Sequence, residues 1–380
     1  MPELVEIGMG RTARRAYDLD EVHIVPSRRT RSSKDVSTAW QIDAYRFDIP
    51  MLTHPTDAIV SPATAIRVGE LGGLGVLNAE GLWARHADAP EQLRRLADLV
   101  SEEDGGSDAV RLLQELHAAP IRVDLLNESI RTVREAGVTV AARVSPQHAL
   151  ERTPDLLAAG VELLVVQGTI ISAEHVSRDA AKRAPLNLKE FIADLDVPVI
   201  AGGVADYRTA MHLMRTGAAG VIVGYGASGG TTTDDVLGIR VPMASAIADA
   251  AAARRDYLDE TGGRYVHVIA DGDIRTGGDV ATAIACGADA VMLGDPLASI
   301  DGAPGHGFYW TSAAAHPSLP RSLIWNAASW TTVEMEQLFF GPTSDPSGEV
   351  NLFGALRRAL AKTGYSDLKE FQKVGLSVQA

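Results

Sequence analysis

Short runs of apolar, mostly β-branched residues recur along the chain, separated by longer segments with the spacing of an amphipathic helix. Such runs are typical of strands in a parallel sheet, because strands covered by helices on both faces carry no polar alternation. A glycine usually stands where a helical segment ends and the next apolar run begins. The clearest predicted strands occupy residues 139–144, 163–166, 198–203, 220–224, 266–272 and 290–294.

One phrase that ends a helix and starts a strand repeats as Ala-Gly-Val-Glu-Leu, Gly-Ala-Ala-Gly-Val and Gly-Ala-Asp-Ala-Val. Repetition of a single strand–helix unit favours an α/β fold of the (β/α)8 TIM-barrel type. The alternative, a doubly wound sheet, is built from two nucleotide-binding halves. Residues 70–78 contain the predicted second barrel strand. We therefore predict one (β/α)8 barrel domain over residues 1–380, with residues 301–349 as an irregular, flap-like excursion.

Composition and charge narrow the range of partners. Of the 380 residues, 46% are hydrophobic, which is enough apolar material for a large packed core. The net charge of −14 argues against nucleic acid or an anionic membrane surface as the main partner, since both attract basic faces. The sequence has neither an apolar run of membrane-spanning length nor the charge order of a signal peptide. We therefore expect a cytoplasmic protein.

A glycine-rich loop follows the predicted strand at 220–224. Because glycine has no Cβ and tolerates positive φ, such a loop lets the backbone approach a phosphate closely. Gly226, Gly272 and Gly294 follow the ends of predicted strands, where exposed N–H groups suit an anion. The alternative is that these glycines only cap helices and close tight turns. Asp271 also ends a predicted strand, and a carboxylate there can accept two hydrogen bonds from a ribose diol.

Five motifs agree in order and spacing with those of one enzyme family; they lie at residues 20–26, 55–57, 72–75, 270–272 and 292–294. Together they resemble the IMP dehydrogenase/GMP reductase family over nearly the whole chain. The resemblance implies a purine nucleotide or related small molecule as ligand, NAD or NADP as cofactor, and a homo-oligomer, either a tetramer or an octamer. The paired regulatory (Bateman, or CBS) domain of the dehydrogenases is absent, as in the similar, compact IMP dehydrogenase-related paralogues of actinobacteria.

The resemblance places Thr231 where the family has its nucleophilic cysteine, with Thr233 two residues later as the family's threonine. A threonine hydroxyl is a far weaker nucleophile than a thiolate unless a base activates it. The resemblance therefore implies a protein of purine nucleotide metabolism without the usual NAD(P)-linked oxidation of IMP or reduction of GMP through a cysteine intermediate.

Other positions that the resemblance assigns surround the expected ligand. Gln167-Gly168 stands in place of an aspartate–serine pair beside the nicotinamide. The Arg-Tyr pair of the family's mobile flap has no counterpart, and Arg321 is a candidate to replace its arginine. The positions assigned to substrate binding are Gly226, Ser228, Asp271, Gly272, Asp273, Gly294 and Asp295.

Asp273 and Asp295 replace a glycine and a phosphate-contacting serine of the family. A carboxylate facing the phosphate pocket at ~5 Å would repel one unit of negative charge by roughly 3 kcal/mol at an effective dielectric near 20. The alternative is that both side chains turn to solvent or cap a helix. Three functions stay open: a purine-nucleotide oxidoreductase using a route without cysteine, a non-catalytic binding protein, and a barrel enzyme acting on an uncharged or cationic substrate.

The remaining candidates favour structural roles. Cys286 is the only cysteine, which excludes an internal disulfide and a cysteine-built metal site, and its small apolar neighbours predict a packed thiol. His54 and His267 lie within or beside predicted strands, and we expect packed, hydrogen-bonded imidazoles there. No metal-binding motif is present, so we predict no metal ligand.

Overall fold

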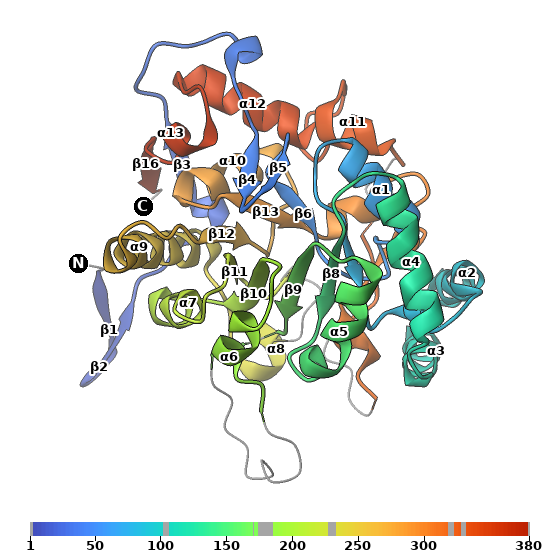
Figure 1. Ribbon diagram of the computed structural model, residues 1–380. Coiled ribbons are helices and arrows are strands. Elements are labelled where there is room, and N and C mark those ends of the chain that lie inside the picture. The colour runs from blue at the N-terminus through green and yellow to red at the C-terminus, as the bar shows by residue number, and fades with distance from the viewer. Residues whose placement is uncertain are drawn as a thin grey trace.

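The computed structural model describes residues 3–101, 106–169, 171–173, 185–226, 233–317, 323–327 and 332–378. Eight parallel strands form one sheet in the order β6-β13-β12-β11-β10-β9-β8-β7, which confirms the predicted (β/α)8 barrel (Figure 1). An isolated parallel bridge between Leu52 and Leu74 joins β6 to the segment before β7 and completes the ring. The strands are β6 (Met51–Thr53), β7 (Val76–Asn78), β8 (Ala141–Val144), β9 (Leu163–Gln167), β10 (Val199–Val204), β11 (Gly220–Val223), β12 (His267–Ala270) and β13 (Ala290–Leu293).

All six strands predicted from apolar runs are present, and burial explains their lack of alternation. In β9 every residue is buried, and Val165 and Val166 are 0% exposed although they point to opposite faces. One face packs inside the barrel and the other packs under the helices, so both faces require apolar side chains. The carboxyl ends of the strands, where ligands bind in such barrels, therefore stand on a rigid apolar support.

Helices surround the barrel, and local signals fix their ends. The hydroxyl of Ser61 accepts a hydrogen bond from the backbone N–H of Thr64, and Pro62 begins α1 at a position that tolerates proline. Gly160, with φ of +104°, ends α5 in the left-handed region that favours glycine. The surrounding helices are α1 (Pro62–Glu70), α4 (Val123–Glu135), α5 (Ala149–Ala159), α6 (Leu188–Ala193), α7 (Tyr207–Met214), α9 (Met243–Thr261), α10 (Gly277–Cys286) and α12 (Leu352–Thr363).

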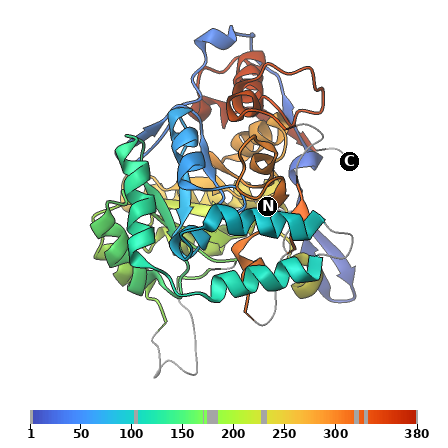
Figure 2. The ribbon, with the colours of Figure 1, turned by 90° about the vertical axis from the view of Figure 1, so that its right-hand side faces the viewer.

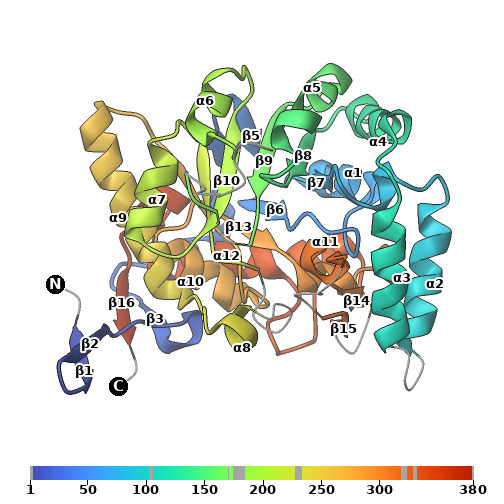
Figure 3. The ribbon, with the colours of Figure 1, turned by 90° about the horizontal axis from the view of Figure 1, so that it is seen from below.

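Additional elements extend the barrel on three sides. Helices α2 and α3 pack against each other outside the ring (teal in Figure 2). The β1–β2 hairpin projects beside α9 (Figure 3), where Arg14 forms an ion pair with Asp249. Strand β16 pairs antiparallel with β3, although the sequence pattern predicts helix over residues 352–376. These elements are β1 (Leu4–Gly8), β2 (Arg11–Arg14), β3 (Val22–Val25), β4 (Trp40–Ile42), β5 (Tyr45–Phe47), α2 (Ala89–Ser101), α3 (Gly106–Ala118), α13 (Leu368–Phe371) and β16 (Gly375–Val378).

The described part of residues 301–349 contains the short hairpin β14 (Phe308–Tyr309) and β15 (Trp325–Asn326), followed by α11 (Met335–Phe340). Tyr309 and Trp310 are buried and fix this segment against the barrel. A further short helix, α8 (Thr233–Leu237), precedes α9. No helix in the described ranges is both long and apolar enough to cross a bilayer. Within the same ranges, no group of three or more His, Cys, Asp or Glu side chains is placed to hold a metal ion.

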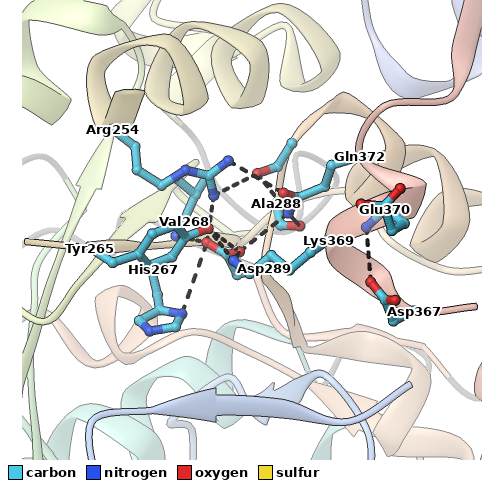
Figure 4. Close-up of polar contacts among 11 residues, drawn as sticks. Arg254, Tyr265, His267, Val268, Ala288, Asp289, Asp367, Lys369, Glu370 and Gln372 are labelled. Carbon is cyan, nitrogen blue, oxygen red and sulfur yellow. Dashed lines mark hydrogen bonds and ion pairs between the residues drawn. The ribbon is translucent and has the colours of Figure 1, made fainter. Parts of the chain in front are cut away.

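A buried ionic cluster ties the C-terminal segment to the amino end of the barrel (Figure 4). Its centre is Asp289, just before β13, whose carboxylate accepts hydrogen bonds from Arg254 (2.6 Å) and Tyr265 (2.7 Å). Lys369 and Gln372, on and just after α13, contact the same carboxylate. Because catalytic groups in such barrels occupy the opposite end, this cluster has a structural role.

Candidate functional site

The carboxyl end of the barrel gathers buried polar side chains from several strands. None of them is more than 7% exposed, so each must be paired within the protein or by a ligand. They are His54, Asn78, Arg143, Gln167, Asp271 and Asp295.

Asp271 is the centre of this group. Its Oδ2 accepts a hydrogen bond from Nε2 of Gln167 at 2.8 Å, and its Oδ1 lies 3.1 Å from Nδ1 of His54. Because a carboxylate only accepts, the Nδ1 of His54 carries the proton. His54 is therefore packed and hydrogen-bonded, as predicted, and it also orients the carboxylate. Three strands thus hold one acidic group facing the mouth of the barrel.

A second layer of charged side chains supports Gln167. The guanidinium of Arg143 donates to the backbone carbonyl of Gln167 at 2.7 Å and lies 3.5 Å from Glu80. Glu80 in turn accepts hydrogen bonds from the N–H and the hydroxyl of Ser145, each at 2.8 Å. Burial opposes the charge on Glu80, but Arg143 and Ser145 outweigh it and lower the pKa of Glu80. Sequence reasoning missed this layer, although Arg143 interrupts an otherwise apolar predicted strand.

A small cavity lies at the ends of β12 and β13. Asp271, Asp273, Gly294, Asp295 and Tyr309 are among its lining residues. With Gly272, which also lines it, the cavity brings together five residues that the resemblance assigns to substrate binding, and it adds Tyr309. No sequence signal identified Tyr309, because it lies in the segment predicted to be irregular.

The charge of Asp295 is only partly compensated. Its carboxylate pairs with Nε of Arg275 at 2.9 Å and is 6% exposed. Burial raises the pKa of Asp295, and the nearby Asp273 adds to this effect, while Arg275 opposes it. Asp295 therefore lines the cavity and is paired with Arg275, and it does not turn to solvent. Asp273 adopts a left-handed backbone with φ of +49° and lines the same cavity.

Tyr309 carries a polar atom that the described residues leave unsatisfied. Its side chain is 0% exposed, and its hydroxyl has no hydrogen-bond partner among them. Burial, together with Asp271 and Asp295, raises the pKa of Tyr309 well above its usual range, so the phenol stays protonated. An unpaired buried hydroxyl destabilises the free protein and is available to a bound ligand.

We expect Tyr309→Phe to leave the free energy of unfolding unchanged or to raise it by up to about 1 kcal/mol, because the variant removes a buried, unpaired hydroxyl. Urea denaturation of the two proteins measures the difference. A loss of stability would show that the hydroxyl has a partner that stabilises the free protein.

A second, larger cavity adjoins the first through Asp273. Gly226, Thr233 and Arg240 line it. Gly226 has φ of +88°, and its N–H donates to the backbone carbonyl of Asp271, so this glycine performs the tight-turn role that was the alternative to anion binding. Thr231, Ser228 and Arg321 lie outside the described residues.

The remaining residues that the resemblance assigns, Gly272, Gly168 and Gln167, differ in their contacts. Gly272 lines the smaller cavity. The N–H of Gly168 donates to the carbonyl of Gly202, and the carbonyl of Gly168 accepts from Gly203, so both backbone groups of Gly168 are already engaged. Gln167 points to Asp271 through its amide nitrogen, whereas its buried Oε1 has no partner among the described residues.

The family model for the IMP dehydrogenase / GMP reductase domain matches residues 16–316. An uncharacterized oxidoreductase of Mycolicibacterium smegmatis is 65% identical over 376 residues, covering 99% of this chain and 100% of its own. An inosine-5'-monophosphate dehydrogenase of Korarchaeum cryptofilum is 26% identical over 365 residues, covering 76% of each chain. The crystal structure of an IMP dehydrogenase/GMP reductase-like protein from Corynebacterium glutamicum matches with a TM-score of 0.93 and 57% identity, covering 99% of this chain and 98% of that one.

Proposed function

The chain belongs to the IMP dehydrogenase/GMP reductase family, and from this membership we propose that it binds a purine nucleotide or a related purine compound at the carboxyl end of its barrel. The observation that carries the proposal is Asp271, a buried carboxylate oriented by His54 and Gln167 beside a cavity. A carboxylate held in this way is suited to accept hydrogen bonds from the two hydroxyls of a ribose.

Under this proposal, the protein does not use the covalent cysteine chemistry of the family. Cys286 is the only cysteine of the chain, and it lies at the carboxyl end of α10, on the side of the barrel opposite the cavity. Burial raises the pKa of the Cys286 thiol to about 12, so almost no thiolate forms at neutral pH. With Thr231 at the position that the resemblance assigns to the nucleophile, attack on the purine through sulfur has no candidate residue.

NAD or NADP is the cofactor that family membership implies, and one orphaned atom fits a nicotinamide. The buried Oε1 of Gln167 lacks a partner among the described residues, and a carboxamide N–H would satisfy it. When bound, the cofactor supplies a hydride acceptor or donor. Gln167 would then hold the nicotinamide on one side while its Nε2 continues to orient Asp271.

A thermal-shift panel with IMP, GMP, XMP, inosine, guanosine, NAD and NADPH, singly and in pairs, tests the proposal, with cofactor absorbance followed for every compound that stabilises the protein. We expect stabilisation by a purine compound without a change in cofactor absorbance. Turnover of IMP or GMP would contradict the expected lack of catalysis and would favour an oxidoreductase that uses a route without cysteine. No stabilisation by IMP, GMP, XMP, inosine or guanosine would contradict the proposed function as a whole.

Asp271→Asn should weaken binding of the stabilising purine compound about 10- to 100-fold, because a neutral amide replaces a charged acceptor for hydroxyl hydrogen bonds. Isothermal titration calorimetry measures the ratio. Asp301→Asn, at an exposed position, is the matched control and should bind as the wild-type chain does. If the Asp271 variant and the wild-type chain bind the compound with equal affinity, this carboxylate does not contact the ligand.

A further inference from the structure

We propose that the ligand is a purine nucleoside rather than a nucleotide, and that the cavity between Asp271, Asp295 and Tyr309 receives uncharged hydroxyl groups and excludes phosphate. This inference rests on the proposed function and specifies its ligand class. It is carried by two independent features of the smaller cavity, which are the signs of the charges around it and the unpaired Tyr309 hydroxyl.

The charges that line the cavity are negative. Asp271, Asp273 and Asp295 contribute carboxyl groups, and no described lining residue is basic. Arg275 pairs with Asp295 without lining the cavity. A phosphate dianion placed here would lie beside three carboxyl groups in a buried setting, where Coulomb repulsion is strong. A hydroxyl group carries no such penalty and can donate to each carboxylate.

The neighbouring larger cavity offers little positive charge in compensation. Its described lining contains one arginine, Arg240, which pairs with Asp18 at 2.9 Å and lies 3.9 Å from Asp234. Two acidic side chains therefore share its charge. Since the chain as a whole carries −14, the wider field also disfavours a dianion.

Tyr309 supplies the observation that points to a ligand. Its hydroxyl is completely buried and has no partner among the described residues, and Tyr309 is one of the residues that line the cavity. A protonated phenol has both a donor and an acceptor to offer, which matches a neutral hydroxyl or ring nitrogen. A ligand that completes this bond gains a hydrogen bond that the free protein lacks.

Tyr309 also fills the space beside the backbone where an anion would bind. A Cβ placed on Gly294 would lie 2.5 Å from the Tyr309 hydroxyl, so the phenol lies directly against this glycine. Anion sites at strand ends require close approach to exposed backbone N–H groups. At Gly294 the Tyr309 side chain occupies part of the space through which an anion would reach the backbone. The absence of a side chain at Gly294 therefore makes room for the phenol.

Calorimetric titration of the full chain with inosine, guanosine, IMP and GMP under identical salt and pH tests the inference. We expect each nucleoside to bind at least about tenfold more tightly than its 5′-monophosphate. Equal or tighter binding of IMP and GMP overturns the inference and leaves the proposed function standing. If none of the four compounds binds, the proposed function fails and the inference fails with it.

Two variants separate the charge effect from the hydroxyl effect. Asp295→Ser, which leaves Arg275 without its carboxylate partner, should strengthen IMP binding about tenfold and change inosine binding far less. Unchanged IMP binding would contradict the electrostatic part of the inference.

Tyr309→Phe should weaken inosine binding about fivefold or more while its melting temperature stays the same or rises. Tyr365→Phe is the matched control, because Tyr365 is also buried but its hydroxyl bonds to the carbonyl of Lys373 away from the cavity. Loss of binding together with a lower melting temperature would assign Tyr309 a structural role only.

Discussion

Asp289→Asn should lower the free energy of unfolding by about 3–5 kcal/mol, because it leaves the buried guanidinium of Arg254 without its anionic partner. Both side chains of this pair are less than 10% exposed. The Asn side chain has the same shape, so the loss reports charge and hydrogen bonding and not volume. One of its two terminal atoms would be an amide donor facing the donors of Arg254, Tyr265 or Val268.

The expected loss of stability is large because side chains from several elements contact the single carboxylate of Asp289. Helix α9 contributes Arg254, the segment leading into β12 contributes Tyr265, and α13 contributes Lys369. Burial alone would raise the pKa of Asp289, but Arg254 and Lys369 outweigh it and hold the pKa well below its usual range. The stabilisation from Asp289 is therefore present above about pH 4 and is lost only as pH falls through its depressed pKa.

Urea denaturation at pH 7 measures this effect, and Glu260→Gln is the matched control. Glu260 pairs with Arg215 at 2.7 Å, but both side chains are about half exposed. Exposed ion pairs contribute little because water already solvates both partners, so we expect little or no change in this control. Equal effects of the two variants would contradict the structural role assigned to the cluster.

Single substitutions at Asp57 and His117 should give opposite pH dependences of stability, each about 1.4 kcal/mol per pH unit relative to wild type between pH 4 and 6.5. The two side chains lie beside the carboxyl end of the barrel, with Asp57 buried, the His117 side chain 12% exposed, and Nε2 of His117 3.6 Å from Oδ2 of Asp57. Burial raises the pKa of Asp57 from 3.8 to about 7 and lowers the pKa of His117 from 6.5 to about 3. Arg85 reinforces the neutral form of His117 and opposes the neutral form of Asp57.

The signs follow from the protons bound in each state. Within this window the native state holds one extra proton on Asp57, and the unfolded state holds one extra proton on His117, so the wild-type contributions cancel. In Asp57→Asn only His117 remains, and stability should rise with pH by roughly 3 kcal/mol across the window. In His117→Gln only Asp57 remains, and stability should fall with pH by a similar amount.

Urea denaturation at pH 4.5, 5.5 and 6.5 gives the three slopes. The direct check is the protonation state of the His117 imidazole by nitrogen NMR at pH 5.5, where we expect the neutral form. A protonated imidazole would show that the two residues form an ion pair, and slopes indistinguishable from wild type would contradict the shifted pKa values.

The sequence predicted the barrel because its signal is local and repeated. Runs such as residues 163–166 and 220–224 are apolar on both faces, and only a strand covered by helices requires that pattern. Strand β16 was missed because Gly375–Val378 is an exposed edge strand whose pairing with β3 depends on residues about 350 positions away. No local window contains that information.

The candidate site was predictable only in part. Asp271 could be located because it ends a predicted strand, and Asp295 because the family resemblance assigns it; the structure places both in one cavity. Tyr309 and Glu80 could not be located, since their positions depend on how β14 and the segment after β7 fold over the barrel. The ion pair between Arg275 and Asp295 could not be predicted either, because Arg275 has no sequence signal of its own. This pair limits how strongly Asp295 can repel a ligand.

The most direct test of the account is a crystal structure of the protein with the purine compound that stabilises it most. We predict that the ribose hydroxyls lie within hydrogen-bond distance of the Asp271 carboxylate and that a neutral ligand atom meets the hydroxyl of Tyr309. A purine bound elsewhere on the molecule, or one whose phosphate occupies the cavity beside Asp295, would contradict the account.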